Sequence, residues 1–567
     1  MGSTISITGM GIICAIGNDA KAVYESLRNG QSGVRSMKYL SSKHSDLPVG
    51  EVQLSNDEMK ALLGIDDARP MSRTSLMGAI AVRQALAQAG IKEVHGKKVV
   101  LISGTTVGRM DLTEQKFYAQ KADGKLIEVP KCNECGESTH EIASLAGLGG
   151  IATCTVSTAC SSALNSIILG AEMLKTGEAD IVIAGGSEAL SRYHLNGFNT
   201  LMILDARPCR PFDADRAGLN LGEGAAFVVL ERDAERSLGY VAGYGNRCDA
   251  FHQTASSENG EGAYLAMEDA LLMAGLRPED IQYVNAHGTG TPNNDASESQ
   301  AIMRVFGNSV PEVSSTKGFT GHTTSAAGSI ETVICLLALQ HGFTPANIGW
   351  ESQTDGLIVP TRGHTDVSLE NVMCNSFGFG GNDSSLVISR HEPEAGSRAF
   401  REMPVKVLAE ESVVSVEELK ALKEFVPPME SRRMGNLMKA VHLSAFRALK
   451  AAGISCPDAI VTATAHGMYE TSMQFLEDIA NNGEEMLKPT LFMLSTHNTI
   501  GSALAIRTGC HGYNMTYSHG EESEAWAMRD AERLIRTGKA GNVLVCAFDE
   551  DISGSSLHAK AVIMSGN

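Results

Sequence analysis

One cysteine in small, polar surroundings is the first candidate for chemistry. Cys160 lies in TVSTACSSA, at the turn where an apolar strand pattern gives way to the start of a helix pattern. Unpaired N–H groups and the helix dipole at such a place favour thiolate over thiol, which predicts an activated nucleophile. A structural role is the alternative, because cysteine is among the most buried residue types. The small polar neighbours at 157, 158, 161 and 162 would let a substrate approach, and they favour the nucleophile.

Two histidines follow on loops rich in glycine and threonine. His287 lies in NAHGTGTP (285–292), directly after an apolar strand pattern, and His322 ends STKGFTGH (315–322) before another helix pattern. A single histidine of this kind is more often structural than catalytic. Two of them, together with a thiol at a helix start, form a set that can perform nucleophilic and acid–base chemistry.

A glycine-rich loop, NSFGFGGN (375–382), lies beside a further strand pattern. It lacks the GxGxxG spacing and the strand-to-helix context of a dinucleotide site. Its glycines predict instead a loop whose backbone N–H groups face an oxyanion.

The elements that must position these residues alternate between strand and helix patterns. Residues 5–13 and 98–103 are apolar runs typical of buried strands, separated by a helix pattern that Gly90 stops. A strand–helix–strand unit follows at 153–186, with its helix ending at Gly177, and a second series runs from about 240 to 390. This alternation predicts a layered α/β domain made of two related halves.

The chain repeats part of itself near its end. The segment from Thr155 matches the segment from Met515 at an offset of 361 positions, set by the KTGEAD and RTGKAG turns, so Cys160 faces Glu521 (or Gly520, if the register slips by one). Residues 392–404 are charged and carry Pro and Gly, which is typical of a linker. We therefore interpret 405–567 as a trimmed third copy of the first half that lacks the stretch around 195–224.

Length and composition narrow the function classes. At 567 residues the chain predicts two or more domains, and its net charge of −19 argues against nucleic acid as a partner. The apolar runs are too short to span a membrane, and no secretory start pattern is present. Twelve scattered cysteines predict a reduced, cytoplasmic protein, and the lone CxxC at 132–135 is a weak zinc signal, so we expect no metal.

Four motifs together resemble the β-ketoacyl-(acyl carrier protein) synthases of the thiolase superfamily. TVSTACSSA, VNAHGTGTP, SSTKGFTGHTTSAAG and CNSFGFGGN match that family in order and spacing, across about residues 3–390. The resemblance implies a thiolase-like layered αβαβα fold, with an N-terminal half at 1–242 and a C-terminal half at 243–391. It also implies no bound cofactor, because the acyl carrier protein substrate brings its own phosphopantetheine.

The resemblance implies roles for the matching residues. Cys160 would take an acyl chain, and His287 and His322 would hold the carbonyl of a malonyl thioester as it loses carbon dioxide. The enolate would then attack the Cys160 thioester, with the oxyanion held by the backbone N–H groups of Cys160 and Phe379. Lys317 and Glu331 match family residues that tune the charge and orientation of the histidines.

Further positions match by the same resemblance. Thr289 and Thr291 match threonines that contact pantetheine, and Phe379, followed by Gly380, matches an aromatic that swings to admit substrates. Arg210 matches an arginine that docks the carrier protein. Asn382-Asp383 departs from the usual Thr-Asn pair after GFGG.

The third copy resembles the chain-length factors of type II polyketide systems, in particular truncated versions associated with aryl polyene pigments. It keeps no HGTGT, KGFTGH or GFGG motif, and an acid at a helix start such as Glu521 is favourable without any catalytic role. We expect 405–567 to pack on the synthase domain as an internal pseudo-dimer, with a homo-oligomer as a further option, and to shape its acyl tunnel.

Two other functions compete with a condensing enzyme in fatty acid or polyketide biosynthesis. A thiolase or a coenzyme A-primed initiating enzyme is disfavoured by the histidine pair, since thiolases combine a histidine with a second cysteine. A catalytically silent scaffold is disfavoured for 1–391 by the intact Cys-His-His set, but it suits 405–567.

Overall fold

The first unit of the molecule carries five strands. We describe it from a computed structural model that covers residues 4–122, 134–393, 403–432, 434–550 and 557–566. Its strands are β1 (Ile5–Cys14), β2 (Val99–Gly104), β3 (Ala152–Val156), β4 (Ile181–Glu188) and β5 (Gly224–Arg232). Its helices are α1 (Ala20–Arg28), α2 (Asn56–Leu63), α3 (Arg73–Ala89), α4 (Met110–Ala122), α5 (Cys135–Leu145), α6 (Ser162–Thr176) and α7 (Arg192–Thr200).

The second unit repeats the pattern. Its strands are β6 (Gly239–Cys248), β7 (Tyr283–Asn285), β8 (Glu312–Ser314), β11 (Asn371–Gly378) and β12 (Asn382–Ser389), beside a separate small pair formed by β9 (Phe343–Thr344) and β10 (His364–Thr365). Its helices are α8 (Glu261–Ala274), α9 (Pro292–Phe306), α10 (Lys317–Thr320) and α11 (Ala327–His341).

The third unit, 405–567, is the C-terminal module. Its strands are β13 (Lys406–Val413), β14 (Ala459–Ala463), β15 (Tyr513–Tyr517), β16 (Asn542–Glu550) and β17 (Leu557–Ser565). Its helices are α12 (Pro428–Ser431), α13 (Asn436–Ala452), α14 (Tyr469–Asn482), α15 (Pro489–Met493), α16 (Thr499–Thr508) and α17 (Ser523–Arg536).

Strand order is the same in all three units. Hydrogen-bonded neighbours run β13-β17-β16-β14-β15-β3-β2-β4-β5-β1-β6-β12-β11-β7-β8. Numbered within its own unit and read from the unit's third strand, each set of five runs third, second, fourth, fifth and first; the outer two sets stand in the opposite direction to the middle one. The parallel and antiparallel pairs also correspond, since β14 is parallel to β15 and β16 as β2 is to β3 and β4. The predicted pair of related halves and the trimmed third copy are confirmed.

Two buried helices form the central layer of the first two units, which together make the domain that resembles a synthase (residues 4–393, the synthase domain). All residues of α6 from Ser162 to Leu174 and of α11 from Ala327 to Leu339 are buried, and the two helices contact each other. Outside them, α3 packs on β1 and β5, and α8 packs on β6 and β12. Glycines in the left-handed conformation end α3 and α6, at Gly90 (φ 72°) and Gly177 (φ 74°), as the sequence predicts. The layers are those of the thiolase-like αβαβα fold.

The C-terminal module joins the synthase domain edge to edge. Strands β15 and β3 run antiparallel, with Tyr517 opposite Val156. Ser157 donates its N–H to the Thr516 carbonyl (2.9 Å), and Ser518 donates its N–H to the Thr155 carbonyl (3.0 Å). The two bonds are equivalent under the 361-position offset, which relates Ser157 to Ser518 and Thr155 to Thr516. The junction is therefore a pseudo-twofold axis within a single chain.

A buried cation reinforces the junction beside these strands. The Arg533 guanidinium of α17 lies 2.7 Å from Glu178 of the synthase domain and 2.7 Å from Asp530 of its own helix, and its side chain is 3% exposed. Nearby, Lys539 pairs with Glu172 at 2.5 Å, again across the junction.

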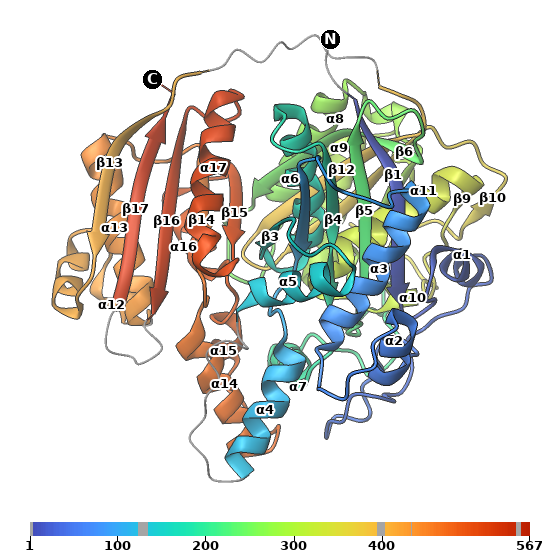
Figure 1. The fold of residues 1–567 in the computed structure, drawn as a ribbon, viewed down its shortest axis with the longest axis horizontal. Coiled ribbons are helices and arrows are strands. Elements are labelled where there is room, and N and C mark those ends of the chain that lie inside the picture. The colour runs from blue at the N-terminus through green and yellow to red at the C-terminus, as the bar shows by residue number, and fades with distance from the viewer. Residues whose placement is uncertain (1–3, 123–133, 394–402, 433, 551–556, 567) are drawn as a thin grey trace.

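Helices make a second, apolar part of the junction. Figure 1 shows α4 and α7 of the synthase domain lying against α14 and α15 of the module, at the lower end of the view. Their aromatic side chains interlock: the Tyr193 ring lies 5.2 Å from Phe475 and 6.0 Å from Phe492, centroid to centroid. Because burial of such rings is strongly favourable, this contact ties the position of α7 to the module.

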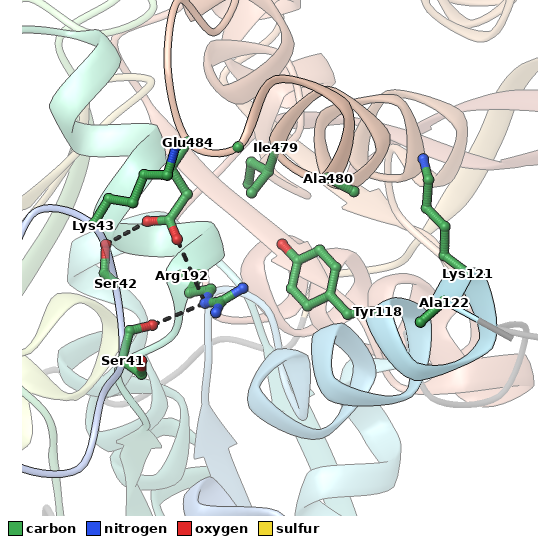
Figure 2. A pocket seen from close by; sticks show the side chains of 11 residues that line it. Ser41, Ser42, Lys43, Tyr118, Lys121, Ala122, Arg192, Ile479, Ala480 and Glu484 are labelled. Atoms are coloured by element: carbon green, nitrogen blue, oxygen red, sulfur yellow. Dashed lines mark hydrogen bonds and ion pairs between the residues drawn. The ribbon is translucent and has the colours of Figure 1, made fainter.

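A cavity of about 590 Å³ opens beside these helices (Figure 2). Glu484 of the module enters it, accepts hydrogen bonds from Ser42 and from Asn196 (3.1 Å), and lies 3.6 Å from Arg192 at the start of α7. Its backbone φ of 70° is unusual for a residue with a side chain. This polar contact and the apolar one hold α7 from two sides.

Two sequence predictions fall largely outside the described residues: the linker at 392–404 and the CxxC at 132–135. Of the latter pair only Cys135 is described, and its thiol contacts His497 at 3.6 Å. Within the described part of the chain, no group of three or more metal-ligating side chains is found, and no helix is long and apolar enough to cross a membrane.

We expect Arg533→Ala to lower the free energy of unfolding by about 3 kcal/mol, because it leaves the buried Asp530 without its cation. Chemical denaturation, followed by tryptophan fluorescence, measures this loss. The matched control is Lys21→Ala, which removes a surface pair (85% and 59% exposed) and should cost about 0.5 kcal/mol or less. Equal stabilities for the two variants would contradict a structural role for the junction.

Candidate active site

Local backbone geometry places Cys160 at a sharp turn. β3 ends at Val156, a single helical turn spans 159–161, and α6 follows. Ala159 adopts φ 52°, in the left-handed region that favours glycine. Ser162 accepts a hydrogen bond from the Thr158 N–H (2.9 Å) and donates to the Ala159 carbonyl (2.6 Å). These bonds hold the strained turn that presents the thiol.

The thiol is buried, and this corrects one expectation. Cys160 is 5% exposed, and burial raises its pKa to about 11. The backbone N–H groups of Phe379 and Cys160 and the charge of Lys317 lower the pKa, but desolvation outweighs them. A helix start alone predicts a thiolate; in this site the resting group is a neutral thiol.

A histidine partner for the thiol lies within contact distance. His322 Nε2 is 3.2 Å from Cys160 Sγ, and the His322 backbone N–H donates to the Asn220 carbonyl (2.7 Å). Burial holds the pKa of His322 well below its usual value, and the Lys317 charge acts in the same direction. A neutral imidazole at this position can accept the S–H proton when the thiol attacks.

The second histidine faces the first. The rings of His287 and His322 lie 5.3 Å apart at 85°, and burial likewise holds the pKa of His287 well below its usual value. His287 Nδ1 lies 3.5 Å from Lys317 Nζ. Because an ammonium only donates, Nδ1 accepts, so the hydrogen of the His287 ring is on Nε2.

A buried ion pair stands behind the histidines. Lys317 lies 2.5 Å from Glu331 of α11, and the side chains are 1% and 3% exposed. Burial raises the pKa of Glu331 to about 7 against the opposing pull of Lys317. Without Glu331, Lys317 would be an unpaired buried charge, so the pair stabilises both residues. Because Lys317 Nζ also contacts His287 Nδ1, the pair helps to fix the orientation of the His287 ring.

The glycine-rich loop closes the site over the thiol. Gly378 passes so close to the nucleophile turn that an added Cβ would lie 2.7 Å from the Thr158 carbonyl oxygen. Next to it, the Phe379 N–H points at Cys160 Sγ, and the Phe379 ring stacks on Phe198 at 5.7 Å. The predicted oxyanion donors, the N–H groups of residues 160 and 379, thus converge on the sulfur.

Other predicted residues lie around this centre. Thr289 and Thr291 are nearly buried, and their hydroxyls share a hydrogen bond of 2.9 Å. Arg210 has an 84%-buried side chain whose guanidinium contacts Asp205 (3.5 Å) and the Asp215 carbonyl (2.7 Å). A role for Arg210 in carrier docking stays a prediction, because its charge already has internal partners.

The trimmed copy keeps the turn without the chemistry. Gly520 adopts φ 59° where Ala159 has 52°, and His519 donates its N–H to Ser523 as Thr158 does to Ser162. Glu521 therefore stands at the position of Cys160, which excludes the alternative register with Gly520. Its side chain is exposed, as expected for an acid that only favours a helix start.

Sequence reasoning missed several supporting residues. Glu298 accepts the backbone N–H groups of His287 (2.8 Å) and Gly288 (2.7 Å), and Ser376 donates to the Cys160 carbonyl (3.1 Å). Phe198 lies 6.4 Å from the His322 ring. The buried Glu298 could have been suspected from its place on a helix after the NAHGTGTP loop, but no pattern marks Phe198.

Known protein families match this chain in three segments. The β-ketoacyl synthase N-terminal domain matches residues 3–236, its C-terminal domain matches 238–351, and a second N-terminal domain of that family matches 409–555. The 3-oxoacyl-[acyl-carrier-protein] synthase 2 of Vibrio cholerae is 33% identical over 68% of this chain and 99% of its own. That of Staphylococcus aureus is 32% identical over 68% and 98%.

Solved structures extend the likeness. The ishigamide ketosynthase/chain length factor is 30% identical over 69% of this chain and 100% of its own, with a TM-score of 0.64. The PfaC keto synthase–chain length factor covers 99% of this chain and 78% of its own with a TM-score of 0.82, and at 18% identity it shows a shared fold. The chain is an enzyme that belongs to the β-ketoacyl synthase family, with a synthase-like module added at its C-terminal end.

Proposed function

We propose that the chain catalyses the decarboxylative condensation of an acyl group on Cys160 with malonyl-acyl carrier protein. One observation carries the proposal: a thiol, two neutral imidazoles and two backbone N–H groups converge in one buried site. The family relationship supports an acyl carrier protein as the partner, and one relative of known structure is a ketosynthase in complex with an acyl carrier protein.

The first half-reaction transfers the acyl group. Cys160 Sγ attacks the acyl thioester while its proton passes to His322 Nε2, 3.2 Å away. The N–H groups of Cys160 and Phe379 hold the oxyanion as it forms. Stabilisation of this kind is usually the largest single contribution to the rate enhancement of an enzyme. The carrier's pantetheine sulfur then leaves and takes the proton from His322. The result is a neutral site and a thioester on Cys160.

The second half-reaction makes the carbon–carbon bond. His287 Nε2–H donates to the malonyl thioester oxygen. His322 donates to the same oxygen once its ring hydrogen is on Nε2, a tautomer open to it because a thioester on Cys160 no longer offers an S–H to that nitrogen. Carbon dioxide leaves, and the electron pair becomes an enolate held by these two donors. The enolate carbon attacks the Cys160 thioester, whose tetrahedral oxyanion collapses to release 3-oxoacyl-carrier protein and the Cys160 thiolate. The thiolate takes up a proton from solvent, which restores the neutral thiol.

The products belong to fatty acid or polyketide biosynthesis. Sequence identity to the 3-oxoacyl synthases supports the former, and the ketosynthase/chain length factor likenesses support the latter. Aryl polyene synthesis stays a prediction that rests on the resemblance of the third copy. The two histidines favour this reaction over a thiolase or a coenzyme A-primed initiating enzyme. A silent scaffold fits only the C-terminal module.

The module has its own proposed role, which is to shape the acyl tunnel. Phe492 of α15 lies 5.4 Å from Phe198, ring to ring, and Phe198 in turn lies 6.4 Å from His322. A Cβ added to Gly197 would lie 2.2 Å from the Phe492 ring. An acyl chain growing from Cys160 past Phe198 would therefore meet aromatic side chains supplied by the module.

Cys160→Ala and His287→Ala should separate the two half-reactions. With acyl-carrier protein, intact-mass analysis should show a covalent acyl adduct on the wild type and on His287→Ala, but none on Cys160→Ala. Malonyl-carrier protein decarboxylation should fall about 100-fold or more in His287→Ala, because a positioned donor to the developing enolate is lost.

The matched control is Cys456→Ala, which removes an exposed thiol and should keep both activities. An adduct that survives in Cys160→Ala would reject the assigned nucleophile. Loss of acylation together with decarboxylation in His287→Ala would reject the assigned division of labour.

Phe492→Ala should lengthen the products by at least one two-carbon unit, because it removes the ring that backs Phe198. Mass spectrometry of the acyl chains formed from malonyl-carrier protein measures this shift. The control is Phe425→Ala, which removes a module ring that stacks instead on Phe446 (5.8 Å). Unchanged chain lengths in an active Phe492→Ala variant would refute the tunnel proposal.

A further inference from the structure

The loop that carries Phe379 is held from the C-terminal module as well as from the synthase domain. Asn498 immediately precedes α16 and is 1% exposed. Its side-chain Nδ2 donates to the Phe379 carbonyl (2.9 Å) and to Asn382 Oδ1 (2.7 Å). Both hydrogens of one amide thus engage the loop, on either side of its two central glycines.

The fit between loop and module is close. Gly380 adopts φ 85°, and a Cβ built on it would lie 2.0 Å from Ser502 Oγ and 3.0 Å from Asn498 Nδ2. On the other side, the Gly380 N–H donates to the Gln253 carbonyl of the synthase domain (2.7 Å). The loop is therefore clamped between the two parts of the chain, and only glycine leaves room for the clamp.

A buried amide network continues this contact to the nucleophile turn. Asn382 Nδ2 donates to the Asn514 carbonyl (3.0 Å), and the Asn514 N–H donates to Asn246 Oδ1 (3.0 Å). Asn246 donates to Asn165 (2.8 Å), which donates to Thr158 Oγ1 (2.9 Å), two residues before Cys160. Buried polar networks of this kind restrict the arrangement of the groups they join.

We infer that Asn498 is a positioning residue for the oxyanion hole: the module holds the Phe379 peptide in the orientation in which its N–H faces Cys160. The N–H and carbonyl of Phe379 belong to adjacent peptide planes, so anchoring the carbonyl restricts rotation about the residue and keeps the donor aimed. The module therefore contributes to the rate of acyl transfer, separately from any effect on chain length. This inference rests on the proposed acyl transfer to Cys160.

The consequence differs between the half-reactions. Attack on a thioester at Cys160 places negative charge on an oxygen that the Phe379 N–H must hold. Decarboxylation of the malonyl group places charge on an oxygen held by His287 and His322. In the described structure, the side chain of Asn498 donates to Phe379 and Asn382 and to neither histidine. A positioning role in the oxyanion hole therefore predicts loss of one step with retention of the other.

The test uses Asn498→Ala and Asn498→Asp in the full chain, with acyl-carrier protein and malonyl-carrier protein as substrates. Asn498→Ala removes both donors, and Asn498→Asp turns a carboxylate oxygen toward two acceptors, so its effect should be larger. We expect the rate of Cys160 acylation to fall about 10-fold in the first and about 100-fold in the second, comparable to weakening one oxyanion donor. Malonyl decarboxylation should stay within threefold of wild type.

Ser502→Ala is the matched control, since Ser502 touches the same loop but its hydroxyl has no hydrogen-bond partner in the described structure; it should keep both rates. Unchanged acylation in both Asn498 variants would overturn the inference. So would equal losses in both steps, because they would reveal a general disruption of the site. Failure of the wild-type chain to form any acyl adduct would instead reject the proposed function.

Discussion

Exclusion of water from the Cys160 site governs the chemistry of the whole molecule. Cys160, His287 and His322 are at most 5% exposed, and burial raises the pKa of the thiol while it lowers the pKa of both imidazoles. All three are therefore neutral at rest. This condition suits a reaction in which charge develops only in transition states and is met there by fixed donors rather than by water. The buried ammonium of Lys317 beside the histidines is balanced by Glu331.

Water must be kept out of this site by packed protein groups, and the C-terminal module supplies some of them. The edge strand β3 leads directly into the nucleophile turn, and β15 of the module covers it. Aromatic rings of α14 and α15 close the space beside Phe198, and Asn498 seats the loop of Phe379. The retained parts of the third copy include those that meet these surfaces. Its own nucleophile position holds an exposed glutamate, so the copy serves the neighbouring site.

Much of this could be predicted from the sequence. Periodicity and helix-ending glycines indicated the strands and helices around Gly90 and Gly177, and the 361-position repeat indicated a third unit. Motif residues such as Cys160 and His287 indicated where the active site lies. The thiolate expectation was wrong because a helix start is visible in a sequence, whereas the burial that outweighs it depends on packing between distant segments.

The contacts across the junction could not be predicted, for the same reason. Asn498 lies in a copy without catalytic motifs, and Phe379 is 119 positions away from it. The sequence shows that Asn382 replaces the threonine usual after GFGG, but not what this asparagine does. In the structure its side chain accepts a hydrogen bond from Asn498 and donates one to the Asn514 carbonyl. Only the folded chain brings these groups together.

The alkylation rate of Cys160 as a function of pH tests the account most directly. With a thiol pKa of about 11, the rate of iodoacetamide alkylation, followed by intact mass, should rise about tenfold per pH unit from pH 6.5 to 9, as the small thiolate fraction grows. The Cys160→Ala variant corrects for reaction at other thiols. A rate that levels off below pH 8 would show a stable thiolate at rest and would contradict the neutral, desolvated site on which the mechanism depends.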